Sequence, residues 1–212
     1  IINCKIGFDA KLFTENILEK YFENKVNLIP IVFNFNNKAN KAESKIFKLK
    51  RSVVGEESTS KLKKIKNFLL KKKINYLYVS ASENVNWLLN IRGKDLPNSP
   101  IINLKLIFDK NGKLYLFSNK KKIIFLKKIL PKKIYYYNES NFFHVINKLR
   151  KKTFCIDRYT CSIFEKKIIS SKFEIVSEID PIYSLKSTKN YIEIKNTVNA
   201  HIEDGVALTK FL

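Results

Sequence analysis

The sequence predicts an α/β fold in which helices flank a mixed β-sheet. Short runs of apolar and aromatic residues, typical of strands, alternate with longer segments whose apolar residues recur at helical spacing. Asn111-Gly112 separates two of the short runs and is a strong signal for a tight hairpin. A mixed sheet with helices packed on it fits this order of elements.

The individual elements follow from the same patterns. We expect strands at residues 4–8, 28–33, 76–79, 104–108, 114–117, 134–137, 154–157 and 173–176. We expect helices after Asp9 and at residues 58–69, 82–89, 123–130, 142–149 and 162–169, and a long one from about residue 191. Residues 34–57 are polar and weakly periodic, which predicts a linker, and Asp180-Pro181 marks a boundary.

Two of these helices have candidate N-caps. Asp9 precedes a segment with one apolar face, and Ser82 precedes the helix that carries Trp87. Both side chains can accept a hydrogen bond from the first turn of a helix. The apolar positions after Asp9 are Leu12, Phe13, Ile17, Leu18 and Tyr21.

The formal charge of +22 over 212 residues first suggests a nucleic-acid or membrane-surface protein. Nearly all of the positive charge is lysine, whereas phosphate clamping and base reading favour arginine. Lysine, Asn, Ile and Phe are abundant together, a bias that an AT-rich genome produces, so we favour biased coding over a specific nucleic-acid role. In the basic segment 120–133, apolar residues at helical spacing indicate a helix that covers the sheet and turns its lysines to solvent.

The sequence contains no Met, begins at Ile1 and ends within a helical pattern, so we expect a fragment of a longer protein. No apolar run approaches the length of a membrane span. The three cysteines, Cys4, Cys155 and Cys161, are widely spaced, which predicts reduced, buried thiols in a cytoplasmic protein.

Few residues suggest chemistry. His144 lies near an apolar helical face, and His201 and Asp204 are spaced to share one, but a metal site needs more donors at fixed spacing. Asp157 and Asp180 fit caps and turns better than a pair of catalytic acids.

Residues 86–100, NWLLNIRGKDLPNSP, are the most informative segment. We interpret Trp87, Asn90, Arg92 and Asp95 as a substrate-access rim, in which Arg92 would hold a carboxylate or carbonyl. The alternative is a helix C-terminus finished by Gly93, with Arg92 at the negative end of the dipole and Trp87 in the core.

Three segments resemble the three-domain Xaa-Pro aminopeptidases (aminopeptidase P) of the creatinase and prolidase superfamily. They are residues 53–108, the looser match DRYTCSIFEKKI, and residues 180–212. The last segment matches the family pattern at Lys186, Lys189, Asn190, Glu193, Ala200, His201, Asp204 and Gly205. The segment NFNNKANKAESK departs from the family pattern, so the geometry of the first linker stays open.

The resemblance implies three parts of the chain. Residues 1–56 would be the end of the first creatinase-like domain with its linker, 57–181 the second such domain, and 182–212 a linker with the first helix of the pita-bread catalytic domain. The family removes an N-terminal residue that precedes proline, with two divalent metal ions, usually manganese, held in that catalytic domain. None of those ligands, and no catalytic residue, can be carried onto this chain.

We therefore expect a non-catalytic N-terminal portion that is inactive alone and belongs to a protein that cleaves proline-containing peptides, generally as a homodimer. We expect no specific nucleic-acid partner and no membrane. The alternatives are a relative that kept the fold as a binding module after losing catalysis, a prolidase- or creatinase-type enzyme, and a basic nucleic-acid module.

Overall fold

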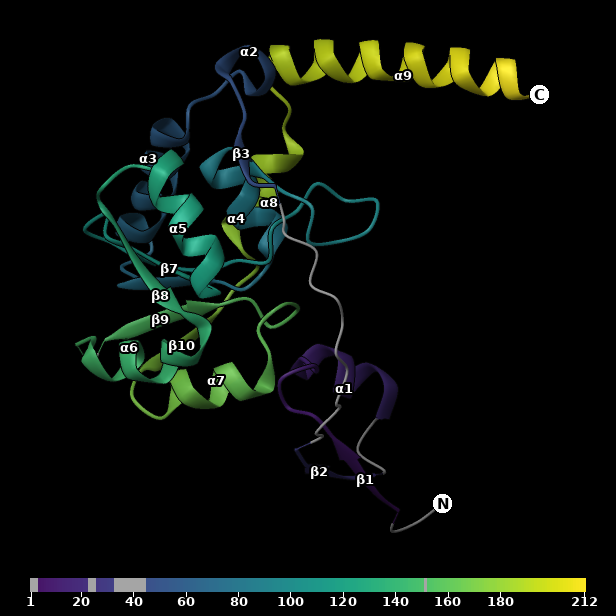
Figure 1. Ribbon diagram of the computed structural model, residues 1–212. Coiled ribbons are helices and arrows are strands. Elements are labelled where there is room, and N and C mark those ends of the chain that lie inside the picture. Colours follow the sequence, from purple (N-terminus) through teal and green to yellow (C-terminus); the bar gives the residue numbers. More distant parts are fainter. Residues whose placement is uncertain (1–3, 23–25, 33–44, 151) are drawn as a thin grey trace.

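A six-stranded mixed sheet forms the centre of the molecule (Figure 1). The computed structural model describes residues 4–22, 26–32, 45–150 and 152–212. The strand order is β10 (Glu174–Ser177), β9 (Thr153–Ile156), β4 (Tyr76–Val79), β6 (Lys105–Asp109), β7 (Leu114–Ser118) and β8 (Ile134–Asn138). Strand β6 is antiparallel to both β4 and β7, and the other pairs are parallel. The predicted fold class is therefore confirmed.

Helices cover both faces of this sheet. On one face lie α3 (Ser58–Lys71), α4 (Ser82–Leu89), α5 (Lys120–Ile129) and α8 (Pro181–Ser187). On the other lie the short 3₁₀ turn η2 (Glu139–Asn141), α6 (Phe142–Lys148) and α7 (Ile163–Ser170). Apart from α8 and the 3₁₀ turn, each of these helices was expected near its position.

Strand β4 shows why the sheet has two cores. Successive side chains of a strand point to opposite faces. Leu77 and Val79 therefore pack in the cluster under α3 and α4, whereas Tyr76 and Tyr78 pack in the cluster under α6 and α7. All four side chains are buried, as expected for a central strand that is covered on both sides.

The predicted hairpin joins β6 and β7. Gly112 has a φ of +91°, a left-handed conformation that glycine adopts without steric cost. The backbone N–H of Gly112 donates to the carbonyl of Asp109 over 2.7 Å, which closes the turn. The Asn-Gly signal therefore identified both the turn and the two strands that it joins.

The basic helix α5 also follows the prediction. Leu126 is fully buried against the sheet, whereas Lys121, Lys127 and Lys128 are exposed. The side chain of Asn119 accepts a hydrogen bond from the backbone N–H of Lys122 and caps the helix over 2.9 Å.

A small N-terminal unit lies beside α7 (Figure 1). It contains β1 (Lys5–Phe8), parallel to β2 (Asn27–Pro30), and the helix α1 (Glu15–Phe22). The backbone N–H groups of Ile163 and Phe164, at the start of α7, donate to the carbonyls of Phe13 and Ala10, each over 2.9 Å. The unit is thus attached through the open amide groups of a helix N-terminus.

The predicted capping role of Asp9 is wrong. Its carboxylate accepts the N–H of Lys11 over 2.9 Å and closes a turn, and α1 begins only at Glu15. Thr14 supplies the cap instead, through a bond of 3.3 Å from the Ile17 N–H to its hydroxyl. Leu12 therefore precedes the helix, and both Leu12 and Tyr21, which were expected on its packed face, are exposed.

Ser82 is likewise not an N-cap. Its hydroxyl donates to the carbonyl of Leu104 over 3.0 Å and accepts the Leu104 N–H over 3.1 Å, so it joins α4 to the segment before β6. The predicted turn and cap roles of the two aspartates are correct. Asp180 caps α8 through Ile182 N–H at 2.9 Å, and Asp157 accepts the Tyr159 N–H at 2.8 Å.

The predicted linker, residues 34–57, contains ordered elements in its described part. β3 (Phe47–Lys48) pairs antiparallel with β5 (Ile91–Arg92), and α2 (Arg51–Val54) follows. A strand of two residues is too short to show periodicity. Its partner strand also lies far away in the sequence, so no local hairpin signal marks the pair. Residues 33–44, with most of the segment that departs from the family pattern, lie outside the described residues.

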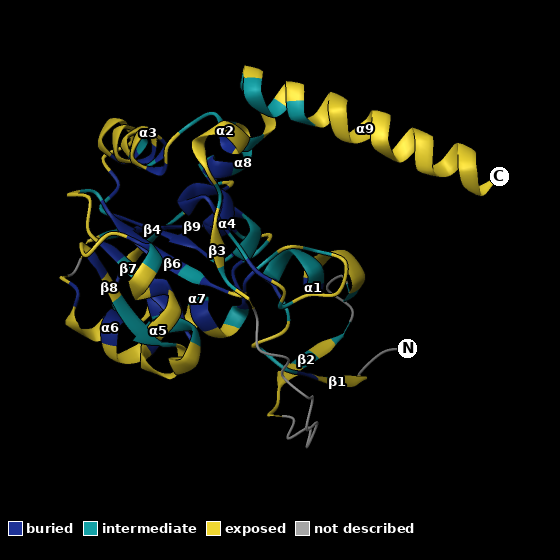
Figure 2. Cartoon of the chain, turned by 45° about the horizontal axis from the view of Figure 1, so that its top comes forward, coloured by how far each residue is buried: buried dark blue, intermediate teal, exposed yellow. Residues whose placement is uncertain are grey.

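The last helix, α9 (Tyr191–Phe211), confirms the expected long C-terminal helix and extends away from the body (Figures 1 and 2). None of its residues is buried. Within the described residues, no helix is long and apolar enough to cross a membrane. Cys155 and Cys161 are buried as predicted, but Cys4 is exposed, so the prediction of three buried thiols fails for Cys4.

Candidate functional site

The C-terminus of α4 brings three of the four predicted site residues together. The helix ends at Asn90, which has φ +55° and a left-handed conformation, and its N–H bonds back to the carbonyls of Asn86 and Trp87. Asparagine adopts this conformation more readily than most residues. The alternative in which Gly93 ends the helix is therefore wrong, since Asn90 ends it three positions earlier and β5 begins directly afterwards.

A buried lysine from α3 lies beneath this helix end. Lys61 has no exposed surface, and its Nζ lies 3.7 Å from the centroid of the Trp87 ring. The same ammonium donates to the Trp87 carbonyl over 3.0 Å and to Asn90 Oδ1 over 2.7 Å. The face of an indole attracts a cation, and more strongly when water is excluded. Lys61, Trp87 and Asn90 therefore form one compact polar cluster in an apolar setting.

Burial lowers the pKa of Lys61 from 10.5 to about 8. The charges of Glu193 and Glu56 oppose this shift, and that of Arg92 adds to it. Taking an ammonium out of water disfavours its charged form, and nearby carboxylates restore part of the loss. Lys61 thus remains largely protonated at neutral pH because hydrogen-bond acceptors and an aromatic ring surround it.

The sequence contains a signal for the burial of Lys61. Lys61 precedes Ile65 and Leu69 at intervals of four residues, so it lies on the inward stripe of α3. A lysine at a core-facing position is rarely buried without a partner. That pattern alone predicts a buried cation with acceptors nearby, although it does not identify them.

Trp87 connects the cluster to α9. Its indole Nε1 donates to Glu193 Oε1 over 3.3 Å, and the residue is only 8% exposed. Glu193 also forms a capping box with Asn190 at the start of α9. Trp87 is therefore a core residue, as the alternative interpretation held, and also contacts a helix that begins a hundred residues later.

Arg92 lies at the edge of the cluster and is half-buried. Its Nη1 donates to the carbonyls of Asn86 and Ile91 over 3.2 and 2.8 Å. These carbonyls lie at and just beyond the C-terminus of α4, where the helix dipole favours a cation. Burial lowers the pKa of Arg92, and the charge of Glu193 opposes that shift.

Asp95 lies apart from the other three residues. Its Oδ2 accepts the N–H of Asn103 over 2.7 Å and forms an ion pair with Lys122 of α5. The backbone N–H of Asp95 donates to the Ile101 carbonyl over 2.9 Å. Asp95 thus holds the loop between β5 and β6 closed against α5.

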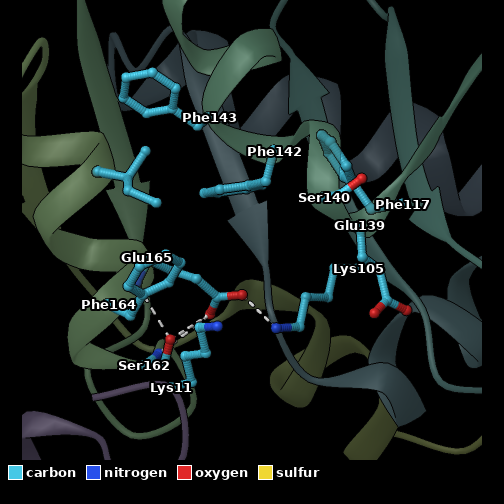
Figure 3. A pocket seen from close by; sticks show the side chains of 11 residues that line it. Lys11, Lys105, Phe117, Glu139, Ser140, Phe142, Phe143, Ser162, Phe164 and Glu165 are labelled. Atoms are coloured by element: carbon cyan, nitrogen blue, oxygen red, sulfur yellow. Dashed lines mark hydrogen bonds and ion pairs between the residues drawn. The ribbon is translucent and has the colours of Figure 1, made fainter. Parts of the chain in front are cut away.

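A cavity of about 410 Å³ lies elsewhere, between the N-terminal unit, the sheet and α6–α7 (Figure 3). None of the predicted site residues lines it. Its aromatic wall includes Phe117 and Phe142, and its buried carboxylate, Glu165, is already bonded to Lys105 and, over 2.8 Å, to Ser162 Oγ. Glu165 is therefore held by Lys105 and Ser162.

The described residues contain no group of three or more His, Cys, Asp or Glu side chains placed to hold a metal ion. His144 is exposed on α6, and His201 and Asp204 are exposed on α9.

A family model for the creatinase/prolidase N-terminal domain matches residues 37–193, most of the chain. The chain belongs to the creatinase/prolidase N-terminal domain family. The match includes the sheet, the cluster around Lys61 and the first residues of α9.

Xaa-Pro aminopeptidases are among the relatives of this creatinase/prolidase N-terminal domain. Xaa-Pro aminopeptidase 1 of Dictyostelium discoideum is 30% identical over 229 residues, which cover 98% of this chain and 36% of that protein. Xaa-Pro aminopeptidase ApepP of Drosophila melanogaster is 30% identical over 182 residues, 79% of this chain and 28% of that protein. The expected resemblance is confirmed, and the chain spans about a third of the length of the relatives it matches.

A solved structure has the same fold. The X-prolyl aminopeptidase of Caenorhabditis elegans, a cytosolic enzyme with a di-nuclear active site, superposes with a TM-score of 0.81 over 100% of this chain and 37% of that one. The sequence identity is 20%, so this similarity concerns the fold alone.

Proposed function

We propose that this chain is the non-catalytic N-terminal portion of a metallo-aminopeptidase that hydrolyses the bond before a proline in second position of a peptide. The observation that carries the proposal is the alignment of 98% of the chain with 36% of an Xaa-Pro aminopeptidase. In the same proposal, residues 1–56 end a first domain, 57–181 form the second, and 182–212 lead into the catalytic domain.

The catalytic metals belong to the part of the enzyme outside this chain. The C. elegans relative has a di-nuclear active site, which supports two metal ions in the complete protein. Manganese is the metal we propose. The donors available here do not suit such a site, because no described cluster of three or more ligating side chains exists. No catalytic step is therefore assigned to residues of this chain.

The substrate-access rim remains part of the proposal, with two different roles. Trp87, Asn90 and Arg92 hold the end of α4, since their polar groups bond to carbonyls or to Glu193. Asp95 fixes the loop that follows, through Asn103 and Lys122. In this arrangement the loop would form the rim and the cluster would support it.

The proposal also includes a cytoplasmic location, a proline-containing peptide as substrate and a homodimer of the full-length protein. The proposal includes no specific nucleic-acid partner and no association with a membrane. The exposed apolar residues of α9 support continuation into a further domain, because apolar side chains on a long helix usually pack against another element.

The test compares purified residues 1–212 with the complete open reading frame in the presence of Mn²⁺. The substrate is a short peptide with proline second, and the control peptide has alanine there. We expect the complete protein to release the first residue only from the proline peptide, and residues 1–212 to release none. Cleavage by residues 1–212 would contradict the non-catalytic assignment. A folded complete protein that cleaves neither peptide would instead support a binding module that has lost catalysis.

A further inference from the structure

The first two turns of α9 are bonded to α2 and the residues next to it. Asn190 Nδ2 donates to the carbonyl of Val54 over 2.8 Å, and Asn196 Nδ2 donates to that of Val53 over 3.0 Å. Both bonds use carbonyls at the end of the short helix α2. The N-terminus of α9 is therefore fixed in part to backbone atoms of α2.

Close packing at Gly55 strengthens this contact. Gly55 has φ +70°, and a Cβ there would lie 2.2 Å from Asn190 Oδ1. Asn190 cannot move away freely, because the same Oδ1 accepts the Glu193 N–H over 3.0 Å in the capping box. The absence of a side chain at Gly55 thus allows α2 to approach the start of α9.

The Lys61 cluster supports the other side of this contact. Lys61 holds Asn90 Oδ1, and Asn90 Nδ2 donates to the Glu56 carbonyl over 2.8 Å. Lys61 also lies against the Trp87 ring, whose Nε1 bonds to Glu193. A single buried ammonium therefore connects α3 and α4 with the residues on which α9 rests.

Beyond Asn196, α9 has no buried residue that fixes its direction. Val198, Ile202 and Val206 are 53%, 62% and 51% exposed. A helix of 21 residues is about 30 Å long, so a tilt of about 10° at its base displaces its far end by about 5 Å. The direction of α9 in this chain thus depends on the contacts at its first two turns.

We propose that Lys61 is a positioning residue, which sets the direction of α9 relative to the sheet by holding the Trp87 indole against Glu193 and Asn90 against Glu56. The proposal rests on the proposed function in one respect: what α9 would orient is the catalytic portion of the enzyme. Lys61 itself would touch neither substrate nor metal.

The test measures the direction of α9 by the distance between two spin labels. Lys71→Cys on α3 and Lys210→Cys near the end of α9 carry the labels in a Cys4→Ser background, because the other two cysteines are buried. The variant is Lys61→Met, which keeps the length of the side chain without its charge. Lys66→Met is the matched control, since Lys66 is an exposed lysine on the same helix.

We expect a narrow distance distribution for the parent and for Lys66→Met, and a broadened or displaced one for Lys61→Met. Trp87 is the only tryptophan, so acrylamide quenching of its fluorescence reports the cluster directly, and quenching should increase in Lys61→Met. Trp87→Phe keeps the ring over Lys61 but loses the bond to Glu193. It tests the same contact by distance if Lys61→Met fails to fold.

Unchanged distances in a folded Lys61→Met, or in a folded Trp87→Phe if Lys61→Met does not fold, would overturn the proposal. Neither measurement uses peptidase activity. If the full-length protein proves inactive, the measured distances still test the role of Lys61. If the full-length protein is active and the distances are unchanged, only the role of Lys61 is refuted.

Discussion

The contribution of Lys61 to the stability of this domain should rise with pH as its ammonium loses a proton. The pKa of Lys61 is about 8 in the folded chain, against 10.5 for an exposed lysine, because burial disfavours the charged form. Between these two pH values Lys61 is protonated in the unfolded chain and largely deprotonated in the folded chain, so its contribution to the free energy of unfolding increases with pH. The fall from 10.5 to about 8 corresponds to a gain of about 3 kcal/mol across that interval.

The perturbation that isolates this effect is Lys61→Met, because methionine does not titrate and fills similar space. Below pH 8 the parent retains a buried ammonium whose bonds to Trp87 and Asn90 offset only part of its desolvation. Relative to the variant, the parent should therefore gain about 3 kcal/mol from pH 8 to above pH 10. Tyrosines titrate in the same range, but they are common to both proteins and cancel in the difference.

The assay is urea unfolding followed by the fluorescence of Trp87, the only tryptophan, at intervals of pH from 7 to 11. Lys66→Met serves as the control and should keep the pH dependence of the parent. If the difference between parent and Lys61→Met stays constant over this range, Lys61 is not in a poorly solvated environment and the reasoning fails.

Three further predictions concern other parts of the chain. Gly55→Ala should destabilise the fold by about 1–3 kcal/mol, because it combines a left-handed φ with a clash at Asn190. Gly205→Ala, in an open helical position, should instead stabilise the fold by up to about 1 kcal/mol. Thermal unfolding of both variants tests this difference, and equal effects would contradict the close packing at Gly55. Burial raises the pKa of Asp180 from 3.8 to about 6, so the stability that Asp180 contributes should fall as pH rises from about 4 to 6. In Asp180→Asn the melting temperature should therefore depend less on pH over this range. An unchanged dependence of the melting temperature on pH would mean that burial does not raise this pKa. Native protein should react with a thiol reagent at Cys4 alone and at all three cysteines in denaturant, and a second fast thiol in native protein would mean that the core around the buried cysteines opens readily.

The elements that local patterns determine were predictable from the sequence. Residues 76–79 form a strand because four consecutive apolar or aromatic residues suit a sheet covered on both faces, and Asn111-Gly112 dictates a turn whatever surrounds it. The antiparallel pair β3–β5 was not predictable, because two residues carry no period and their pairing depends on the position of α4.

The candidate site divides in the same way. Trp87, Asn90 and Arg92 lie within six residues, so their proximity follows from the sequence alone. The bond from Trp87 to Glu193 joins residues 106 positions apart, and only the path of the chain over the sheet brings them together. Lys61 was predictable in part, because helical spacing indicates that its side chain faces inward but does not identify the residues that it contacts.

The attachment of the N-terminal unit to α7 has an evolutionary consequence. Amides of Ile163 and Phe164 bind carbonyls of Phe13 and Ala10, so most replacements at these four positions would leave those bonds intact. A chain whose codons drift towards lysine and asparagine can thus change its surface while the two units stay joined. Proline is the exception at Ile163 and Phe164, because it has no amide hydrogen to donate.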